Sequence, residues 1–169
     1  PNYAESLTKQ DTALMAEYWP EFENLFAHRR TKYQRLFRAI WTFNNAYHII
    51  AAELKHVVIH SAVETLICTS RNNNKNQVVK RLPKMADGTI TEAQTGEAYD
   101  FCGGVKHAAE PALLSSEYVT DLHPDDEKRI EAARMLDEAL RYLFIKALKD
   151  PSFADLLENK TQLAKMYPV

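Results

Sequence analysis

Residues 49–68 read IIAAELKHVVIHSAVETLIC, and this stretch decides the fold. Apolar and small residues recur in it at helical spacing, namely Ile50, Leu54, Val57, Val58, Ser61, Ala62, Thr65 and Leu66. A second apolar stripe consists of Ile59, Val63 and Ile67. A helix that is apolar over so much of its circumference is typical of a buried central helix with neighbours on several sides. We therefore expect the rest of the chain to pack around this helix.

The length, net charge and cysteine content limit the classes of protein to which the chain can belong. The chain has 169 residues, a length that suits one domain with a sizeable core, and a formal net charge of −2 at pH 7. This charge excludes a uniformly basic nucleic-acid binder but allows a local positive patch. Cys68 and Cys102 are too few for a disulfide framework, so we expect a reducing, cytoplasmic location. No stretch reads as a signal peptide or approaches the roughly 20 apolar residues that span a bilayer.

Before the central helix, the pattern predicts one long helical region. Asp11 can cap a first helix. Pro20 then either interrupts this helix or starts the next one. From Phe22 to Ile40 apolar residues keep helical spacing, either as one long helix or as two with a break near residues 29–31.

Helix signals continue after the central helix. Asn74 or Asn76 can start a short helix that Pro83 ends or kinks. Thr91 followed by Gln94 resembles a capping box, which predicts a helix over residues 92–101. The adjacent glycines at 103 and 104 should break that helix.

The C-terminal third begins with a segment, 111–123, that reads as a loop with one turn of helix. Pro124 and the acids after it then predict the start of a long helix with one apolar face. Asp150 and Pro151 end that helix and start a short one carrying Phe153, Leu156 and Leu157. No stretch alternates apolar and polar residues convincingly, so we predict an all-α fold with essentially no sheet.

Three stretches together resemble the ApeA-like branch of the HEPN superfamily. Residues 62–66, with 80–82 downstream, are similar to its first two core helices. Residues 99–108, YDFCGGVKHA, resemble its "Y-D-x-R-S-x-x-x-H-G" segment. Residues 136–144 and 150–153 are similar to its last helix and its "D-P-x-F" close. The resemblance covers about residues 33–160, and it implies a HEPN-like helical bundle at 31–162 preceded by a helical extension at 1–30, in one compact domain.

Many HEPN proteins are metal-independent ribonucleases that pair an arginine and a histidine across a homodimer, so the resemblance implies a homodimer. His107 stands at the histidine position, where it could move a proton near neutral pH. Cys102 stands at the arginine position, and a neutral thiol cannot replace a guanidinium. Gly103 and Ala108 replace the serine and the glycine. Glu64 matches the family's first helix, which implies an orienting role in the cleft. We therefore expect the fold to be retained and catalysis to be lost or weak.

Two basic tracts interrupt the otherwise mixed charge. No acid occurs between Glu23 and Glu53, or between Glu64 and Asp87. The first tract holds Arg29, Arg30, Lys32, Arg35 and Arg38, and the second holds Arg71, Lys75, Lys80, Arg81 and Lys84. These tracts indicate a solvated basic face or a nucleic-acid contact, for which the candidates are Arg71, Lys75, Lys80, Arg81 and Lys106. Tyr33, Phe37 and Trp41 interleave with the first tract at core spacing, which favours packing over base stacking.

The central helix also carries a column of potential metal ligands. His56, His60, Glu64 and Cys68 recur every four residues. A carboxylate-bridged bundle site needs matching Glu-x-x-His pairs on other helices, and the sequence has no second one. We therefore expect no metal and no cofactor. Cys102 reads as a small buried hydrophobe, with a reactive thiol as the alternative.

From these signals we expect a domain that binds RNA or a nucleotide in a stress, defence or toxin-like setting, with impaired ribonuclease activity. One alternative is a non-catalytic dimerisation and scaffolding module of a longer protein. Another is an active metal-independent endoribonuclease that uses His107 and recruits a nearby arginine such as Arg71 or Arg81.

Overall fold

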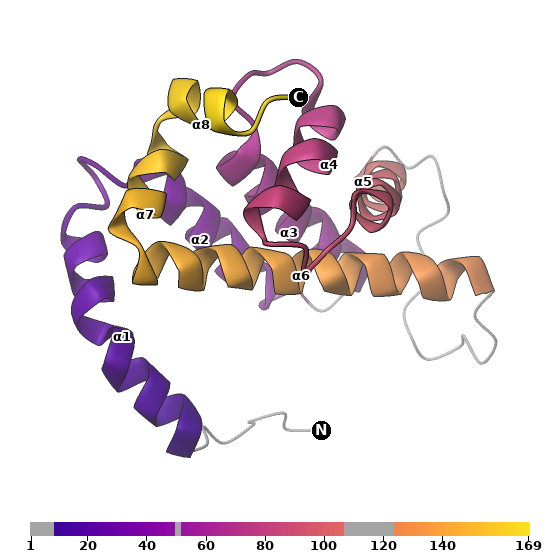
Figure 1. The fold of residues 1–169 in the computed structure, drawn as a ribbon. Helices are drawn as coiled ribbons and strands as arrows, with labels where there is room; N and C mark the ends of the chain where they lie inside the picture. The colour runs from indigo at the N-terminus through magenta and orange to yellow at the C-terminus, as the bar shows by residue number, and fades with distance from the viewer. Residues whose placement is uncertain (1–8, 50–51, 107–123) are drawn as a thin grey trace.

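Helices form the regular structure of residues 9–49, 52–106 and 124–169, which are the residues that the computed structural model describes (Figure 1). They are α1 (Lys9–Ala27), α2 (Gln34–Ala46), α3 (Ala52–Ile67), α4 (Asn74–Met85), α5 (Glu92–Lys106), α6 (Pro124–Lys149), α7 (Pro151–Glu158) and α8 (Lys160–Met166). No strand occurs in these ranges, and the predicted all-α class is confirmed. The segment predicted as a loop at 111–123 lies outside the described residues.

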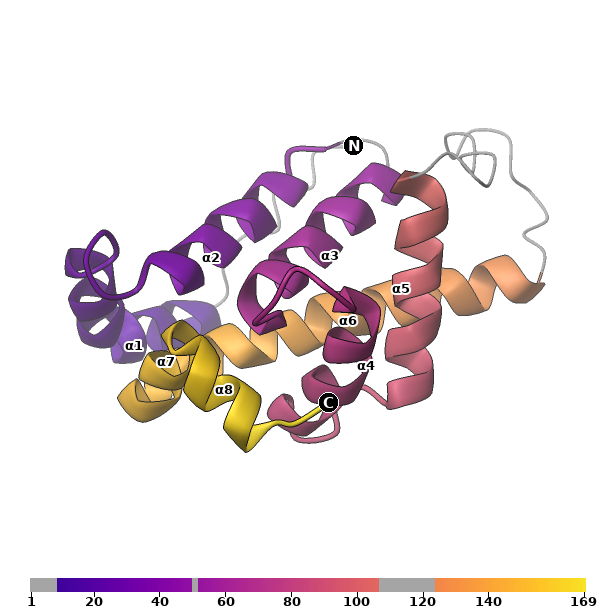
Figure 2. The same ribbon diagram turned by 90° about the horizontal axis from the view of Figure 1, so that it is seen from above.

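The central position predicted for α3 is confirmed. α3 packs against α2, α4, α5 and α6 (Figure 2). The second apolar stripe is fully buried at Ile59, Val63 and Ile67. In the first stripe Ala62 and Leu66 are fully buried, whereas Leu54 is 53% exposed. Burial of apolar side chains on several sides is the main favourable term that holds such a helix in place.

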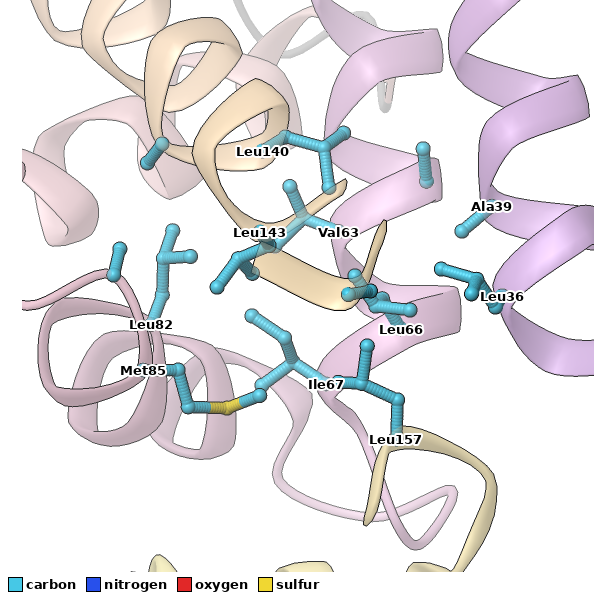
Figure 3. Packing of buried hydrophobic residues seen from close by; sticks show 14 of the residues in the cluster. Leu36, Ala39, Val63, Leu66, Ile67, Leu82, Met85, Leu140, Leu143 and Leu157 are labelled. Atoms are coloured by element: carbon cyan, nitrogen blue, oxygen red, sulfur yellow. The ribbon is translucent and has the colours of Figure 1, made fainter. Parts of the chain in front are cut away.

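The long helix α6 closes the core from the other side. Leu136, Leu140 and Leu143 are buried along one face of α6. Figure 3 shows Leu140 and Leu143 beside Val63 of α3 and near Leu82 of α4, within one buried cluster. Pro124 starts α6 and Asp150 follows its last residue, both as the sequence predicts.

Two helices, not one, precede α3. The break falls in residues 28–33, where the His28 carbonyl accepts from the amides of Thr31, Lys32 and Tyr33. Tyr33 anchors the turn, since its ring is buried and its hydroxyl donates to Asp155 at 3.0 Å. α1 keeps Pro20 inside it and packs on α6, so Pro20 does not divide this helix.

The start of α5 agrees with the prediction and its end does not. The capping box of α5 is confirmed, because the Gln94 amide donates to the Thr91 hydroxyl and the Thr91 amide donates to the Gln94 side chain. The predicted break after residue 101 is wrong, since α5 continues through both glycines to Lys106. A glycine inside a helix costs only about 1 kcal/mol, which packing of α5 on α3, α4 and α6 offsets.

The C-terminal helices extend the packed unit past residue 162. Asp150 caps α7 by accepting from the Ser152 amide at 2.9 Å. The sequence did not separate α8, which Asn159 caps by accepting from the Gln162 amide at 3.0 Å. Leu163 of α8 is fully buried in the main core. None of the helices in the described ranges is both long and apolar enough to cross a membrane.

Candidate functional site

Residues 99–106 of the stretch that resembles the HEPN motif lie on the last turns of α5. Cys102, at the arginine position of that motif, is only 1% exposed and packs with Phe101 and Ala133. Its thiol donates to the His56 carbonyl of α3, with a sulfur–oxygen distance of 3.5 Å. Burial, with a smaller contribution from Glu64, raises the pKa of Cys102 to about 12. The thiol is therefore neutral at physiological pH, and its burial favours the hydrophobe interpretation over the reactive one.

His107 lies outside the described residues, directly after the last residue of α5. Lys106 ends α5, and its side chain is also outside the described part. Their roles in catalysis and in nucleic-acid binding therefore stay predictions.

Glu64 joins three helices. Its Oε1 atom accepts from the Tyr99 hydroxyl of α5 at 2.8 Å and from the Asn74 side-chain amide of α4 at 3.2 Å. The His60 ring lies 4.3 Å from the Tyr99 ring, centroid to centroid, in an edge-to-face arrangement. Burial first, and then the hydrogen bond to Glu64, raise the pKa of Tyr99 well above its usual range. Tyr99 therefore remains a proton donor to Glu64, and this polar cluster fixes α5 against α3.

Sequence reasoning quoted Tyr99 only as part of a motif and did not assign Asn74 any site role. The signal that could have found them is chemical, since both can donate to the carboxylate that the resemblance singles out. Their distance from Glu64 in the chain, ten residues for Asn74 and 35 for Tyr99, hid the contact.

The predicted nucleic-acid contacts separate into surface and interior groups. Lys75 pairs with Asp100 and Lys80 pairs with Glu92, each at 2.6 Å and each from α4 to α5. All four side chains are 44% exposed or more. Arg71 is exposed in the loop before α4. These three cations therefore lie where a phosphate could reach them.

Arg81, in contrast, is buried at 3% exposure. Its guanidinium donates to the Tyr167 and Ile67 carbonyls at 2.8 and 3.1 Å, and to the Gln77 side chain at 2.8 Å. These contacts join α4 to the end of α3 and to the C-terminal segment. The side chain predicted to contact nucleic acid is thus occupied within the protein.

Arg35 has a similar position that the sequence did not predict. It is 9% exposed and donates to the carbonyls of Thr65, Leu157 and Cys68 at 2.7, 2.8 and 2.6 Å. The last carbonyls of a helix have no partner within it and carry partial negative charge. Arg35 and Arg81 therefore stabilise the C-terminal end of α3. Burial lowers the pKa of Arg35 to about 10 and also lowers that of Arg81, so Arg35 stays charged at neutral pH.

An open groove lies beside this end of α3. It has a volume of about 740 Å³ and is lined by Gln34, Arg35, Arg38, Glu64, Thr65, Cys68, Asp155, Glu158, Asn159 and Lys160. Glu158 caps α2 there, since its two carboxylate oxygens accept from the Arg35 and Leu36 amides at 3.0 and 2.7 Å. Arg38 and Lys160 are exposed and take part in no ion pair within the described ranges.

The aromatic residues of the first basic tract do not all pack inside. Tyr33 is buried and Phe37 is half-buried, as predicted. The packing prediction is wrong for Trp41, which is 68% exposed on α2. The physical reason is that Trp41 lies seven residues after Gln34 and three after Arg38, on the exposed side of the helix.

No group of three or more His, Cys, Asp or Glu side chains within the described ranges is arranged to hold a metal ion. Burial raises the pKa of the Cys68 thiol to about 12, so Cys68 is a neutral, poor ligand. Comparisons with models of protein families, with curated proteins and with solved structures find no match to this chain.

Proposed function

We propose that this chain is a HEPN-like domain that binds RNA or a nucleotide and has lost most or all ribonuclease activity. The observation that carries the proposal is the contrast between α4 and α5. The cationic groups of Arg71, Lys75 and Lys80 are accessible on and before α4, and the two lysines are held only in solvent-exposed ion pairs with acids of α5. On α5, the arginine position of the motif is an uncharged, buried thiol.

The exposed ion pairs of α4 are compatible with phosphate binding. Pairs that are half exposed contribute little to stability, about 0–1 kcal/mol, because water screens them. A phosphate can therefore replace Asp100 at Lys75, or Glu92 at Lys80, at small cost. Each such contact also releases counterions, which makes the affinity depend on salt.

The position of Arg81 does not support the alternative in which an active enzyme recruits this arginine. The Arg81 guanidinium donates to the carbonyl of Ile67, whereas Cys102 contacts the carbonyl of His56. A helix rises 1.5 Å per residue, so these carbonyls are roughly 16 Å apart along α3. Arg81 would have to leave its buried contacts to serve the motif.

The test is a binding and cleavage assay with the full chain. A labelled structured RNA is incubated without metal at low and moderate salt, and both anisotropy and gel cleavage are recorded. We expect binding without cleavage, weakened in Lys75→Gln/Lys80→Gln and unchanged in the matched control Lys149→Gln/Lys165→Gln. The salt slope should fall by about 0.7–0.9 for each phosphate contact removed.

Other outcomes decide between the alternatives. Cleavage that disappears in His107→Ala would overturn the loss of activity and favour an active endoribonuclease. No binding even at low salt would overturn the RNA proposal and leave the scaffold.

A second candidate function, dimerisation or scaffolding, rests on the aromatic residues of α1. Trp19 and Phe26 are 51% and 43% exposed, and Phe22 lies between them with ring centroids 5.6 and 5.8 Å away. α1 reaches outward from the end of the body where α6 meets α7 (Figure 1). Exposed aromatic residues on one helix are typical of protein interfaces. Light scattering should then show a homodimer that Trp19→Ser/Phe26→Ser converts to monomer and Ile145→Ser does not.

A further inference from the structure

The outer face of α2 carries an arginine, a tryptophan and two amide side chains. Gln34, Arg38, Trp41 and Asn45 follow one another at helical spacing, so they form one stripe along α2. We call these four residues the α2 stripe. Its first two members line the groove beside the end of α3. Figure 2 shows α2 and α3 side by side. Lys160, the first residue of α8, also lines the groove.

The chemistry of the α2 stripe fits a nucleotide. An exposed tryptophan offers a flat apolar face on which a base can stack. Arg38 precedes Trp41 by three residues, a spacing that separates Cβ atoms by roughly 5–6 Å. A base on Trp41 would therefore hold the adjoining phosphate within reach of Arg38, whose guanidinium can bind a phosphate bidentately.

The charge around the α2 stripe is not neutralised on its own helix. α2 contains Arg35 and Arg38 and no acid. Each acid that lines the groove already has a hydrogen-bond or ion-pair partner. Asp155 pairs with Lys32 at 2.6 Å, and Glu158 caps α2. Glu64 accepts from Tyr99 and Asn74. Of the groove cations, Arg35 is occupied by backbone carbonyls. Arg38 and Lys160 are exposed and pair with no acid in the described ranges.

We infer that the α2 stripe binds single-stranded RNA, with a base stacked on Trp41, the adjoining phosphate on Arg38, and the strand continuing into the groove toward Lys160. This inference rests on the proposed function and specifies the form of its ligand. A duplex hides its base faces, whereas an unpaired strand exposes them, so stacking on Trp41 selects single strands. The other possible occupant is a second copy of the chain, since tryptophan and arginine are also enriched at protein interfaces, and a doubled mass by light scattering would reveal it.

The chain offers a direct probe, since Trp19 and Trp41 are its two tryptophans. In Trp19→Phe, Trp41 is the sole tryptophan, and a short oligoadenylate should quench its fluorescence. In the matched variant Trp41→Phe, Trp19 reports instead, and its fluorescence should not change. A hairpin of equal length should quench Trp41 less than the single strand does.

Anisotropy with the same labelled oligoadenylate measures each contribution. We expect Trp41→Ala to weaken binding about 5- to 150-fold, the range for loss of one base–aromatic stack. Arg38→Gln should lower the salt slope by about 0.7, and the control Lys165→Gln should leave both affinity and slope unchanged.

Three results would overturn the inference, and they are distinguishable. Unchanged affinity in Trp41→Ala, together with weaker binding in Lys75→Gln/Lys80→Gln, would reject the α2 stripe and leave the proposed function intact. No binding of any RNA by the wild type would reject both. A concentration-dependent change of Trp41 fluorescence without RNA, with a doubled mass by light scattering, would assign this surface to a second copy.

Discussion

The two ends of α3 differ in whether buried positive charge lies beside them. At its C-terminal end, Arg35 and Arg81 are buried and donate to carbonyls of the last turn and the segments that follow. Near its N-terminal half, the space beside the His56 carbonyl holds Cys102, Phe101 and Ala133. The difference follows from the helix itself. Carbonyls at its C-terminus lack helical partners, whereas those within it already accept from the amide four residues later.

Each basic tract likewise contains both buried and exposed cations. Arg35 lies inside and Arg38 outside, although they are three residues apart on α2. In the second tract, Arg81 is inside while Arg71, Lys75 and Lys80 are at the surface. Buried guanidinium groups therefore stabilise the fold, and the exposed cations are the ones a ligand can meet. The predictions below test whether this division holds.

The largest effect should come from Cys102→Arg, which restores the residue type of the HEPN motif. The new guanidinium would enter a small apolar cluster of Phe101, Ala133 and Val57, so we expect a loss of about 4 kcal/mol in the free energy of unfolding. Urea denaturation followed by circular dichroism measures this loss. Cys102→Ala, which adds no charge, should cost about 1 kcal/mol. A stable Cys102→Arg variant that cleaves RNA would show that the cluster accommodates a guanidinium.

Arg35→Met should have the next largest effect. The substitution keeps much of the side-chain length but leaves the Thr65, Cys68 and Leu157 carbonyls without the guanidinium. We expect a loss of about 3 kcal/mol in the same urea experiment, since buried unsatisfied groups cost 1–3 kcal/mol. Arg38→Met is the matched control and should change stability by less than about 0.5 kcal/mol. Equal losses of stability in the two variants would contradict the distinction between the buried Arg35 and the exposed Arg38.

Glu158→Gln tests the support of α2 at the same end of the molecule. The carboxylate accepts from the Arg35 and Leu36 amides through its two oxygens, and glutamine retains only one acceptor and no charge. We expect a loss of about 1 kcal/mol, the usual value of an N-terminal cap, seen in calorimetry as a fall in Tm of about 2–4 °C. Glu97→Gln, on the exposed side of α5, should leave Tm unchanged.

Much of the fold was predictable because its signals are local. The stripes of residues 49–68 gave the central helix, and the Thr91–Gln94 pair gave the start of α5. The break at 103 and 104 was predicted wrongly, since glycine is a weak signal that packing can override. The place of α8 was not predicted, because Leu163 is the one residue of α8 that is buried in the core. A single buried residue makes no helical pattern in the sequence.

The candidate site was less predictable because its contacts are distant in the chain. Arg35 reaches Leu157, which is 122 residues away, and no pattern around Arg35 distinguishes it from Arg38. Trp41 shared core spacing with Tyr33 and Phe37, yet only the placement of α3 and α7 decides which side of α2 is covered. The motif singled out Cys102, but the burial of Cys102 depends on contacts with α3 and α6 that no local pattern shows.

The smallest loss of stability should come from breaking an exposed charge pair. This loss is the lower limit against which the effects of buried charges are compared. Asp87 accepts from the Lys146 ammonium at 2.8 Å and from the Tyr142 hydroxyl at 2.6 Å, and these hydrogen bonds, that of Lys146 first, lower its pKa. Asn is a suitable replacement because Asp87 has a φ of 50°, which asparagine tolerates. We expect Asp87→Asn to lose only about 0.5 kcal/mol at pH 7, screening by water included.

The pH dependence of that loss identifies its cause. A carboxyl whose pKa is lower in the folded state stabilises the protein above its unfolded pKa of about 3.9, and this contribution disappears as the pH falls through the folded pKa. The stability difference between wild type and Asp87→Asn should therefore shrink in urea titrations as the pH falls below the unfolded pKa of about 3.9, and it should vanish below the lowered folded pKa. A difference that stays constant with pH would assign the loss to packing instead. A loss at pH 7 as large as that of Arg35→Met would contradict the division between buried and exposed charge.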